Sequence, residues 1–433
     1  MTRDVVPVGP LFRLFGMALL LCSAAACGRD RKPGDGPYAE LVAEFVPKIE
    51  QTMGLPFREP PRVETRSRAE VSAFVRKQLE SERGRTMIEG QAATYRILGL
   101  IPDTLELLGL MQQLLEEQIV GYYDPATKVL YIVEGASKAL LKQTVAHELV
   151  HALQDQYVRI DSIQQMTVDA DRQLAAQSVL EGHAVFMQLR IDPASGPLMK
   201  MPDGWEQIRD MIREGSDGMP VFASAPRTIR EGLLFPYLGG ADFVRRYLAV
   251  RPEKALLTDL PVSTKQILND SAYFATPRDL PSTVTLPAPR MGTVVFTNTF
   301  GEFETRLFLW QHLKAEELAR RGAAGVDGDR MALIRTPSGD AVAWASVWDT
   351  PADAREFLTM AGQAVRRRYQ LPPQPSADSS AQEIAVPSTP TTKARTVRIV
   401  LEERRGQSLV WFLDAPAEVA STLIDRTRIM VAR

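Results

Sequence analysis

The chain has 433 residues, of which 45% are apolar, and its 51 basic and 53 acidic residues leave a formal net charge of -2. A chain of this size can bury a large core, so the sequence predicts a globular protein with two or three domains or one large one. The near balance of charge excludes the strong positive field that attracts nucleic acid, and we expect no nucleic-acid partner.

The N-terminus has the pattern of an export signal. Arg3 and Arg13 precede an apolar run, Leu14–Leu21, and small residues follow this run before Cys27. The apolar run is shorter than the roughly 20 residues that span a bilayer. We therefore interpret residues 1–27 as a cleaved signal peptide.

Cys22 and Cys27 are the only cysteines, so no disulfide is expected within the mature body. A cysteine directly after small residues resembles the acylation site of bacterial lipoproteins, although Ala24 stands where that pattern usually has leucine. The resemblance implies a lipid on Cys27 that anchors the protein to a membrane of the cell envelope, facing the periplasm or the exterior. A secreted protein with the same cleavage pattern is the alternative. Residues 28–37, rich in Gly, Pro and charge, are predicted to be a flexible tether.

The body begins with apolar residues at helical spacing, which predict a helical N-terminal region over residues 38–118. The period then changes. Val120–Tyr123 and Val129–Val133 are β-type runs on either side of a turn that contains Pro125, so we predict a β-hairpin.

Two helices are predicted after the hairpin. Ser137 can cap the first, which reaches to about Val158, and the second spans roughly Ala170–Arg190. Prolines are expected to divide residues 191–292 into short helices and loops.

The C-terminal region, residues 293–433, contains an internal repeat of two strands and a helix. The first copy comprises Met331–Arg335, Val342–Trp348 and Asp353–Tyr369; the second comprises Thr396–Leu401, Leu409–Leu413 and a final helix. We expect an antiparallel sheet backed by two helices. Residues 371–393, rich in Pro, Ser and Thr, are predicted to be a disordered insertion.

The strongest functional signal is an H-E-x-x-H pattern within the first of the two helices. His147 and His151 lie about 40° apart around the helix, so they can hold one ion. Glu148 lies about 60° around the helix from His151 and can reach a water on that ion. Zinc brings the pKa of such a water to about 7 and polarises a carbonyl group. The pattern therefore predicts zinc-dependent hydrolysis with Glu148 as the general base.

A catalytic zinc site needs a third protein ligand, and the second helix offers Glu181 and His183. Their side chains point about 200° apart, so only one of them can face the ion. We favour Glu181, because Gly182 and Ala184 beside it are small enough to let the two helices approach. His183 remains the alternative ligand.

These segments carry a resemblance to known peptidases. H-E-L-V-H at 147–151 and L-E-G-H-A at 180–184 resemble the gluzincin class of zinc metallopeptidases. Ala146–Gln156 looks closer to a group of predicted bacterial and archaeal metallopeptidases with the motif A-H-E-L-x-H-A-L-Q-D-Q. Further similar segments are Gly121–Pro125, Pro261–Leu268 and Gly301–Arg306, although Asn269 and Asp270 stand where that group often has His-Pro.

The resemblance implies that His147, His151 and Glu181 bind Zn²⁺. It also implies a zincin-like, predominantly helical core over residues 119–292. Together with the antiparallel ββα repeat read from the C-terminal sequence, this predicts an α+β fold. The likeness to thermolysin ends at Val185, four residues after Glu181, because valine cannot orient a ligand histidine.

Supporting residues are less sharply defined by the sequence. A zinc-binding histidine usually donates its second ring N–H to another group, and Asp155, Asp169 and Asp171 are the candidates. Tyr237 and His183 are candidates for stabilising an oxyanion, although core packing is the favoured role for Tyr237. The strand Val129–Val133 is the candidate for pairing with an extended substrate.

The sequence thus predicts a lipid-anchored, zinc-dependent peptidase of the bacterial envelope that acts on a peptide or protein substrate. Two alternatives stay open: a non-catalytic envelope scaffold or binding lipoprotein with a structural zinc, and a zinc amidase acting on cell-wall material. Neither the substrate, the cleavage preference nor the oligomeric state follows from the sequence.

Overall fold

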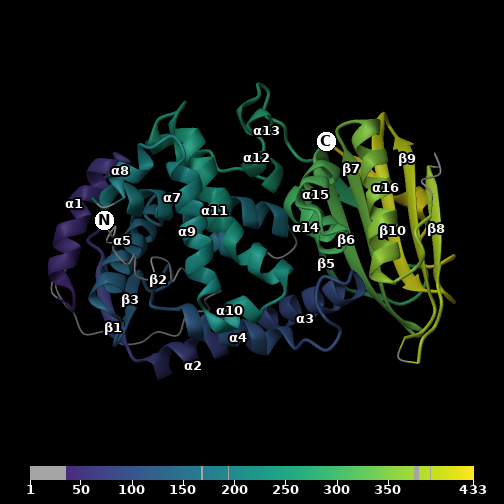
Figure 1. The fold of residues 1–433 in the computed structure, drawn as a ribbon, viewed down its shortest axis with the longest axis horizontal. Coiled ribbons are helices and arrows are strands. Elements are labelled where there is room, and N and C mark those ends of the chain that lie inside the picture. Colours follow the sequence, from purple (N-terminus) through teal and green to yellow (C-terminus); the bar gives the residue numbers. More distant parts are fainter. Residues whose placement is uncertain (1–35, 167–168, 194, 375–379, 391) are drawn as a thin grey trace, which may run out of the picture.

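The computed structural model describes residues 36–166, 169–193, 195–374, 380–390 and 392–433. It is a mixed α and β protein with a helical half and a half built on an antiparallel sheet (Figure 1). The predicted signal peptide with Cys27, and nearly all of the predicted tether, lie outside the described residues. Within the described residues, we find no helix with the length and apolarity that a membrane span requires.

The helical half is built from elements α1 to α13 and β1 to β3. Their bounds are α1 (Ala39–Met53), β1 (Arg62–Arg66), α2 (Arg68–Leu79), α3 (Glu82–Ile97), α4 (Leu107–Gln118), β2 (Gly121–Asp124), β3 (Val129–Val133), α5 (Lys138–Gln154), α6 (Ile160–Gln164), α7 (Ala170–Ile191), α8 (Gly196–Met199), α9 (Gly204–Asp217), α10 (Pro220–Ser224), α11 (Arg227–Leu248), the 3-10 helix η1 (Glu253–Thr258), α12 (Thr264–Leu268) and α13 (Asp270–Phe274).

The sheet half follows. Its elements are β4 (Thr283–Thr285), β5 (Thr293–Asn298), α14 (Gly301–Leu313), α15 (Glu316–Ala323), β6 (Val326–Thr336), β7 (Gly339–Trp348), α16 (Pro351–Arg368), β8 (Ala381–Val386), β9 (Arg395–Arg404), β10 (Gln407–Pro416), the 3-10 helix η2 (Arg426–Arg428) and β11 (Met430–Ala432). Helix α3 reaches from the helical half to contact β5 and β6.

The predicted hairpin is confirmed, and it belongs to a three-stranded sheet in the order β1-β3-β2. Strands β2 and β3 are antiparallel, with Tyr122 opposite Tyr131, whereas β1 pairs with β3 in parallel, with Val63 opposite Leu130. Because β3 is paired on both sides, the expectation that Val129–Val133 offers its edge to a substrate is wrong. The free edge beside the hairpin belongs to β2.

Two predictions about local structure are corrected here. Residues 38–118 are not wholly helical, because Arg62–Arg66 forms β1; its single apolar residue, Val63, gives no alternating signal. Residues 191–292 contain more than short helices, since α11 continues for 22 residues through Pro236. Burial against α7 outweighs the cost of a proline inside a helix, which is about 3 kcal/mol in isolation.

Helices α7 and α11 pack against each other at a pair of glycines. A Cβ atom added to Gly182 would lie 2.0 Å from the carbonyl carbon of Gly240, and one added to Gly240 would lie 1.8 Å from the carbonyl oxygen of Ser178. The expectation that Gly182 serves close packing is therefore confirmed, although the helix it meets is α11.

Replacing Gly240 with alanine should lower the free energy of unfolding by about 3 kcal/mol, because the methyl group has only backbone atoms to displace. The matched control is Gly232→Ala on the same helix, where an added Cβ meets nothing within 4 Å. That change should stabilise the protein by up to about 1 kcal/mol, since alanine is the better helix former. Denaturant unfolding measures both, and equal effects would contradict the close contact.

The larger sheet has six strands among the described residues, in the order β5-β6-β7-β10-β9-β8, and all neighbours are antiparallel. One face packs against α14, α15 and α16, where Trp344 meets the rings of Phe308 and Phe357. The other face is covered by the β4–β11 pair and by residues that include Leu423 and Ile429.

The predicted ββα repeat holds for its first copy and fails in the second. Residues 417–422 after β10 form turns in place of the predicted helix. Ser421 and Thr422 are weak helix formers, and Ala420 and Leu423 are buried against the second face of the sheet. The expectation that 371–393 is disordered is also wrong in part. Ala381–Val386 forms β8 at the edge of the sheet, where Ile384 is buried.

A buried carboxylate lies at the start of α14. Glu302 accepts hydrogen bonds from the Asn269 side-chain amide at 3.0 Å to each carboxylate oxygen, and burial raises the pKa of Glu302 from 4.5 to about 7. Asn269 thus joins the two segments that the sequence had singled out around Leu268 and Gly301.

Because the pKa of Glu302 is raised, we expect the free energy of unfolding to depend on pH. Between pH 4.5 and 7 the folded state holds a proton that the unfolded state releases, so the contribution of Glu302 to stability falls as pH rises. Glu302→Gln removes the titration. Relative to the wild-type chain, the variant should gain about 2–3 kcal/mol in free energy of unfolding between pH 5 and pH 8. The exposed Glu64→Gln is the control, and a parallel pH profile for both variants would refute the assignment.

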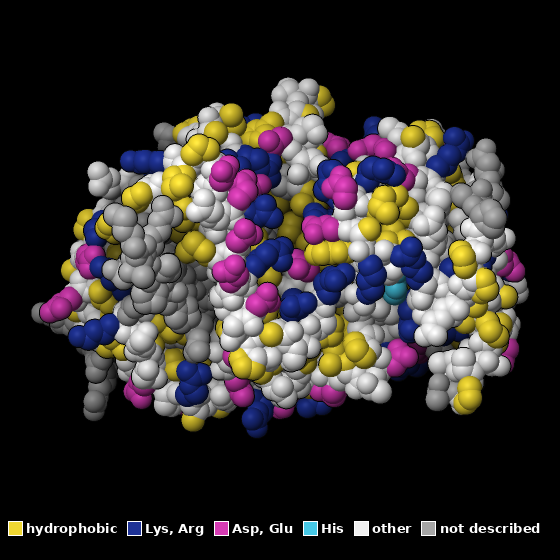
Figure 2. Space-filling model, viewed as in Figure 1, with side chains coloured by type: hydrophobic (Ala, Val, Ile, Leu, Met, Phe, Trp, Pro, Cys, Tyr) yellow, Lys and Arg dark blue, Asp and Glu magenta, His cyan; other side chains and the backbone are white. Residues whose placement is uncertain are grey.

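The charged surface is mixed. Figure 2 shows basic and acidic side chains side by side over α9 and α11, where Arg213 pairs with Glu231 and Arg230 with Asp217. The face shown therefore presents ion pairs over these helices.

Candidate metal centre

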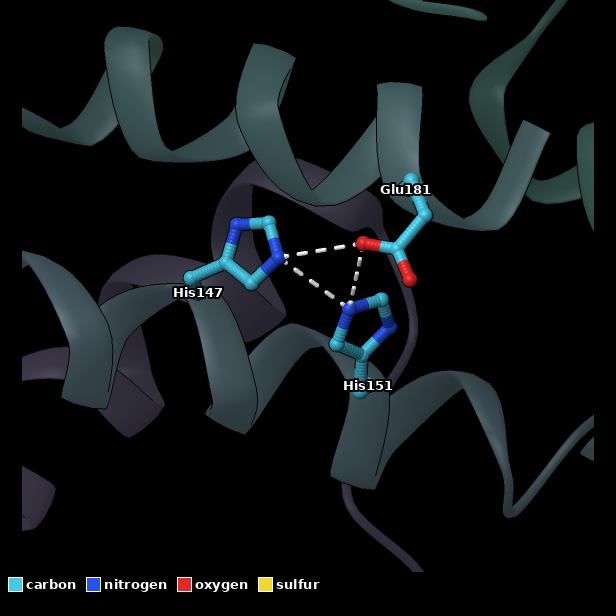
Figure 3. Close-up of side chains that lie close together, drawn as sticks. All are labelled: His147, His151 and Glu181. Atoms are coloured by element: carbon cyan, nitrogen blue, oxygen red, sulfur yellow. Dashed lines mark hydrogen bonds and ion pairs between the residues drawn. The ribbon is translucent and has the colours of Figure 1, made fainter. Parts of the chain in front are cut away.

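Helices α5 and α7 bring three predicted ligands together (Figure 3). The Nε2 atoms of His147 and His151 lie 3.2 Å apart, and each lies close to the same carboxylate oxygen of Glu181, at 3.3 Å and 3.2 Å respectively. Helix α5 begins after Ser137, whose side chain accepts a hydrogen bond from the Leu140 N–H as predicted. The three side chains form a group that could hold a metal ion.

The spacing of these atoms fits zinc. Zinc–nitrogen and zinc–oxygen bonds of about 2.0–2.2 Å at tetrahedral angles place neighbouring ligand atoms about 3.3–3.5 Å apart. The observed triangle of 3.2–3.3 Å agrees with that value to within about 0.2 Å. Three donors of this kind leave the fourth tetrahedral position for water or substrate. The donor set, two imidazoles and a carboxylate, is also typical of zinc hydrolases.

The centre is buried and charged. His147, His151 and Glu181 are 3%, 8% and 4% exposed, so the three groups face one another with little water between them. Burial alone would raise the pKa of Glu181, but His151 and His147 outweigh it and lower this pKa to about 2.

Glu148 lies next to the centre. One of its carboxylate oxygens accepts a hydrogen bond of 2.8 Å from the backbone N–H of Tyr123 in β2. Burial raises the pKa of Glu148, and the charges of His151 and His147 oppose that shift. The predicted base, Glu148, therefore contacts the outer edge of β2 at Tyr123.

The contest between Glu181 and His183 has a clear geometric outcome. Glu181 faces the two histidines, whereas the His183 ring is turned away and lies 3.1 Å from a carboxylate oxygen of Glu253. This is what their angular separation on α7 requires. The same orientation removes His183 from the candidates for stabilising an oxyanion at this centre.

The aspartates predicted to hold a ligand histidine bond elsewhere. Asp155 accepts hydrogen bonds from the Tyr123 hydroxyl and Lys128, Asp169 from Thr299 and the Arg172 N–H, and Asp171 from Thr264 and the Thr264 N–H. The residue that holds His151 is Gln154, whose side-chain oxygen lies 2.8 Å from Nδ1 of His151. Gln154 is three residues along the same helix, a spacing at which side chains meet, so helical geometry could have identified it.

The environment of His147 is different. Its Nδ1 is buried without a hydrogen-bond partner among the described residues. The ring of Tyr237 on α11 lies 6.3 Å from the His147 ring, centroid to centroid. Tyr237 is buried in the hydrophobic core, as core packing requires, and it also lies beside the candidate metal centre. A role in stabilising an oxyanion stays a prediction.

A second acidic group can be set aside as a metal site. Asp279, Asp327 and Asp349 lie close together, but the Lys265 ammonium group is already 2.7 Å from Asp279 and 2.6 Å from Asp349. A lysine in that position supplies the positive charge that an ion would otherwise bring.

Comparison with known proteins gives one match. The family model of a domain of unknown function (DUF8575) matches residues 290–422, which lie in the sheet half and do not include the candidate metal ligands. No curated protein and no solved structure matches the chain.

Proposed function

We propose that the protein is a zinc-dependent peptidase with a zincin-like catalytic core. One observation supports the proposal. The H-E-x-x-H helix and Glu181 bring three buried donor atoms to the separations expected of zinc ligands, and the carboxylate of Glu148 lies beside them. A purely structural zinc site needs ligands but no adjacent base, so Glu148 favours catalysis.

The chain's own residues have distinct tasks in this reaction. When bound, zinc would supply an acidified water and polarise the scissile carbonyl group. Glu148 accepts a proton from the attacking water and passes it to the leaving amine. The N–H of Tyr123 fixes the carboxylate of Glu148 for that transfer.

The free edge of β2 is the proposed place for the substrate backbone. The carbonyl group of Val120 accepts a hydrogen bond from Val133 of β3, and that of Asp124 accepts one from Lys128 in the turn before β3. In this antiparallel register Gly121 and Tyr123 direct their backbone polar groups away from β3. The N–H of Tyr123 on that side meets Glu148. An extended peptide paired here would therefore lie beside the proposed base.

The test uses the metal-loaded full chain. Metal analysis should find about one zinc ion per chain, and incubation with a diverse peptide library should yield cleaved products that a chelator suppresses. If the chain binds zinc but cleaves no peptide, the zinc site is structural and the proposed peptidase activity is wrong. Cleavage of cell-wall amides in place of peptides would favour the amidase.

The location in the envelope is also a proposal and rests on the sequence around Cys27. The native protein should partition with membranes, and the mass of its mature N-terminus should show an acylated Cys27. Cys27→Ser should release the protein from the membrane fraction or leave it unprocessed. An unmodified terminus at any other residue would refute the lipid anchor.

A further inference from the structure

A chain of buried hydrogen bonds leads from the metal centre to the protein surface. Behind His151, the side-chain amide of Gln154 donates from its nitrogen to the carbonyl oxygen of Leu180 at 3.0 Å. The same nitrogen lies 3.4 Å from Nδ1 of His183. Gln154 and His183 are completely buried, so these contacts are sheltered from water.

The donor and acceptor roles along this chain are determined by its ends. A carbonyl oxygen only accepts, so the Leu180 contact identifies the nitrogen of the Gln154 amide and leaves its oxygen to accept from Nδ1–H of His151. The second amide N–H then points to Nδ1 of His183, which accepts. His183 consequently carries its proton on Nε2 and donates it to Glu253 at 3.1 Å.

The chain ends in an ion pair at the surface. The second carboxylate oxygen of Glu253 accepts from Arg190 at 3.0 Å; the Arg190 side chain is 39% exposed and that of Glu253 is 14% exposed. Arg190 is on α7 and Glu253 on η1, which follows α11. Each oxygen of the Glu253 carboxylate thus has its own donor, Arg190 on one side and His183 on the other.

We propose that His183 and Glu253 are positioning residues for the metal centre. Through Gln154 they hold His151 in the tautomer whose Nε2 lone pair faces His147 and Glu181, which is the form that binds a metal. Nδ1 of His147 has no hydrogen-bond partner among the described residues, so of the two histidines only His151 is held at Nδ1 by a neighbouring side chain. The inference rests on the proposed metal site but not on peptidase activity.

Zinc affinity and the visible spectrum of the cobalt-substituted full chain test the proposal. Gln154→Leu removes the direct partner of His151 and should weaken zinc binding by about 10–100-fold. His183 and Glu253 lie one and two hydrogen bonds further from His151 than Gln154 does. We therefore expect His183→Leu and Glu253→Ala to weaken zinc binding by about 3–10-fold, less than loss of the direct partner. Each should also shift the cobalt absorption bands, because the angle of the His151 ring changes.

Two further variants separate positioning from packing. His183→Gln keeps an acceptor and a donor, so it should restore wild-type affinity and spectrum where His183→Leu does not. Glu231→Ala is the matched control for Glu253→Ala: Glu231 is 16% exposed and also pairs with an arginine, but it lies outside the hydrogen-bonded chain. It should leave both measurements unchanged.

Wild-type affinity and spectra in both His183→Leu and Glu253→Ala would overturn the proposal while leaving the zinc peptidase intact. An equal loss in His183→Gln and His183→Leu would also overturn it, because the polar roles would then be irrelevant. Failure of the wild-type chain to bind zinc or cobalt at all would remove the metal site, and with it both the proposed function and this inference.

Discussion

Replacing Glu148 with glutamine should reduce peptide hydrolysis by about 10²–10⁴-fold while the zinc content stays near one ion per chain. Glutamine has the shape of glutamate and can still accept the hydrogen bond from the Tyr123 N–H, but it cannot take a proton from water. The three ligands are untouched, so the change separates catalysis from metal binding. Rates of peptide cleavage and metal analysis on the same samples give the two readouts.

Two variants complete that experiment. Glu148→Asp moves the carboxylate back by one methylene group and should retain part of the activity, because the base remains but its reach changes. Glu134→Gln, at an exposed position just after β3, should behave as the wild-type chain. Full activity in Glu148→Gln would mean that another group takes the proton, and the proposed mechanism would be wrong.

The second large effect concerns the third ligand. Glu181→Ala should weaken zinc binding by about 100-fold or more, because a lost ligand costs more than the 10–100-fold typical of residues that only orient one. His183→Ala should retain the metal, with a loss of no more than about 10-fold, since its ring faces Glu253. Competition with a chromophoric chelator measures both. The reverse order of affinities would rule out a gluzincin-type site.

The grouping of His147, His151 and Glu181 was predictable because its signals are local. The 3.6-residue period and the cap at Ser137 locate α5, and the angular separation of residues on α7 decides between Glu181 and His183. Gly182 also indicated that α7 packs closely against another helix, but the sequence does not identify the partner as Gly240 of α11. That pairing depends on the tertiary fold.

The predictions that failed did so because contacts between residues distant in the sequence decide the structure there. Strand β1 has one apolar residue in five, so its pairing with β3 is set by a partner far along the chain. Pro236 is a local signal that burial overrides. Asp155 was an expected partner of His151 because it lies one turn further along the same helix, but its carboxylate accepts from Tyr123 and Lys128 instead. The side-chain oxygen of Gln154 lies against His151, and its nitrogen donates to the carbonyl oxygen of Leu180.

The central place of β3 bears on how the protein can be damaged. Its sequence, Val129 to Val133, is apolar throughout and every residue is buried, and β1 protects one of its two edges. Loss of β1, by proteolysis before Arg68 or by local detachment, would uncover a strand of the composition that promotes edge-to-edge aggregation. The segment that ends at Arg66 therefore acts as a cover against self-association as well as a part of the sheet beside Glu148.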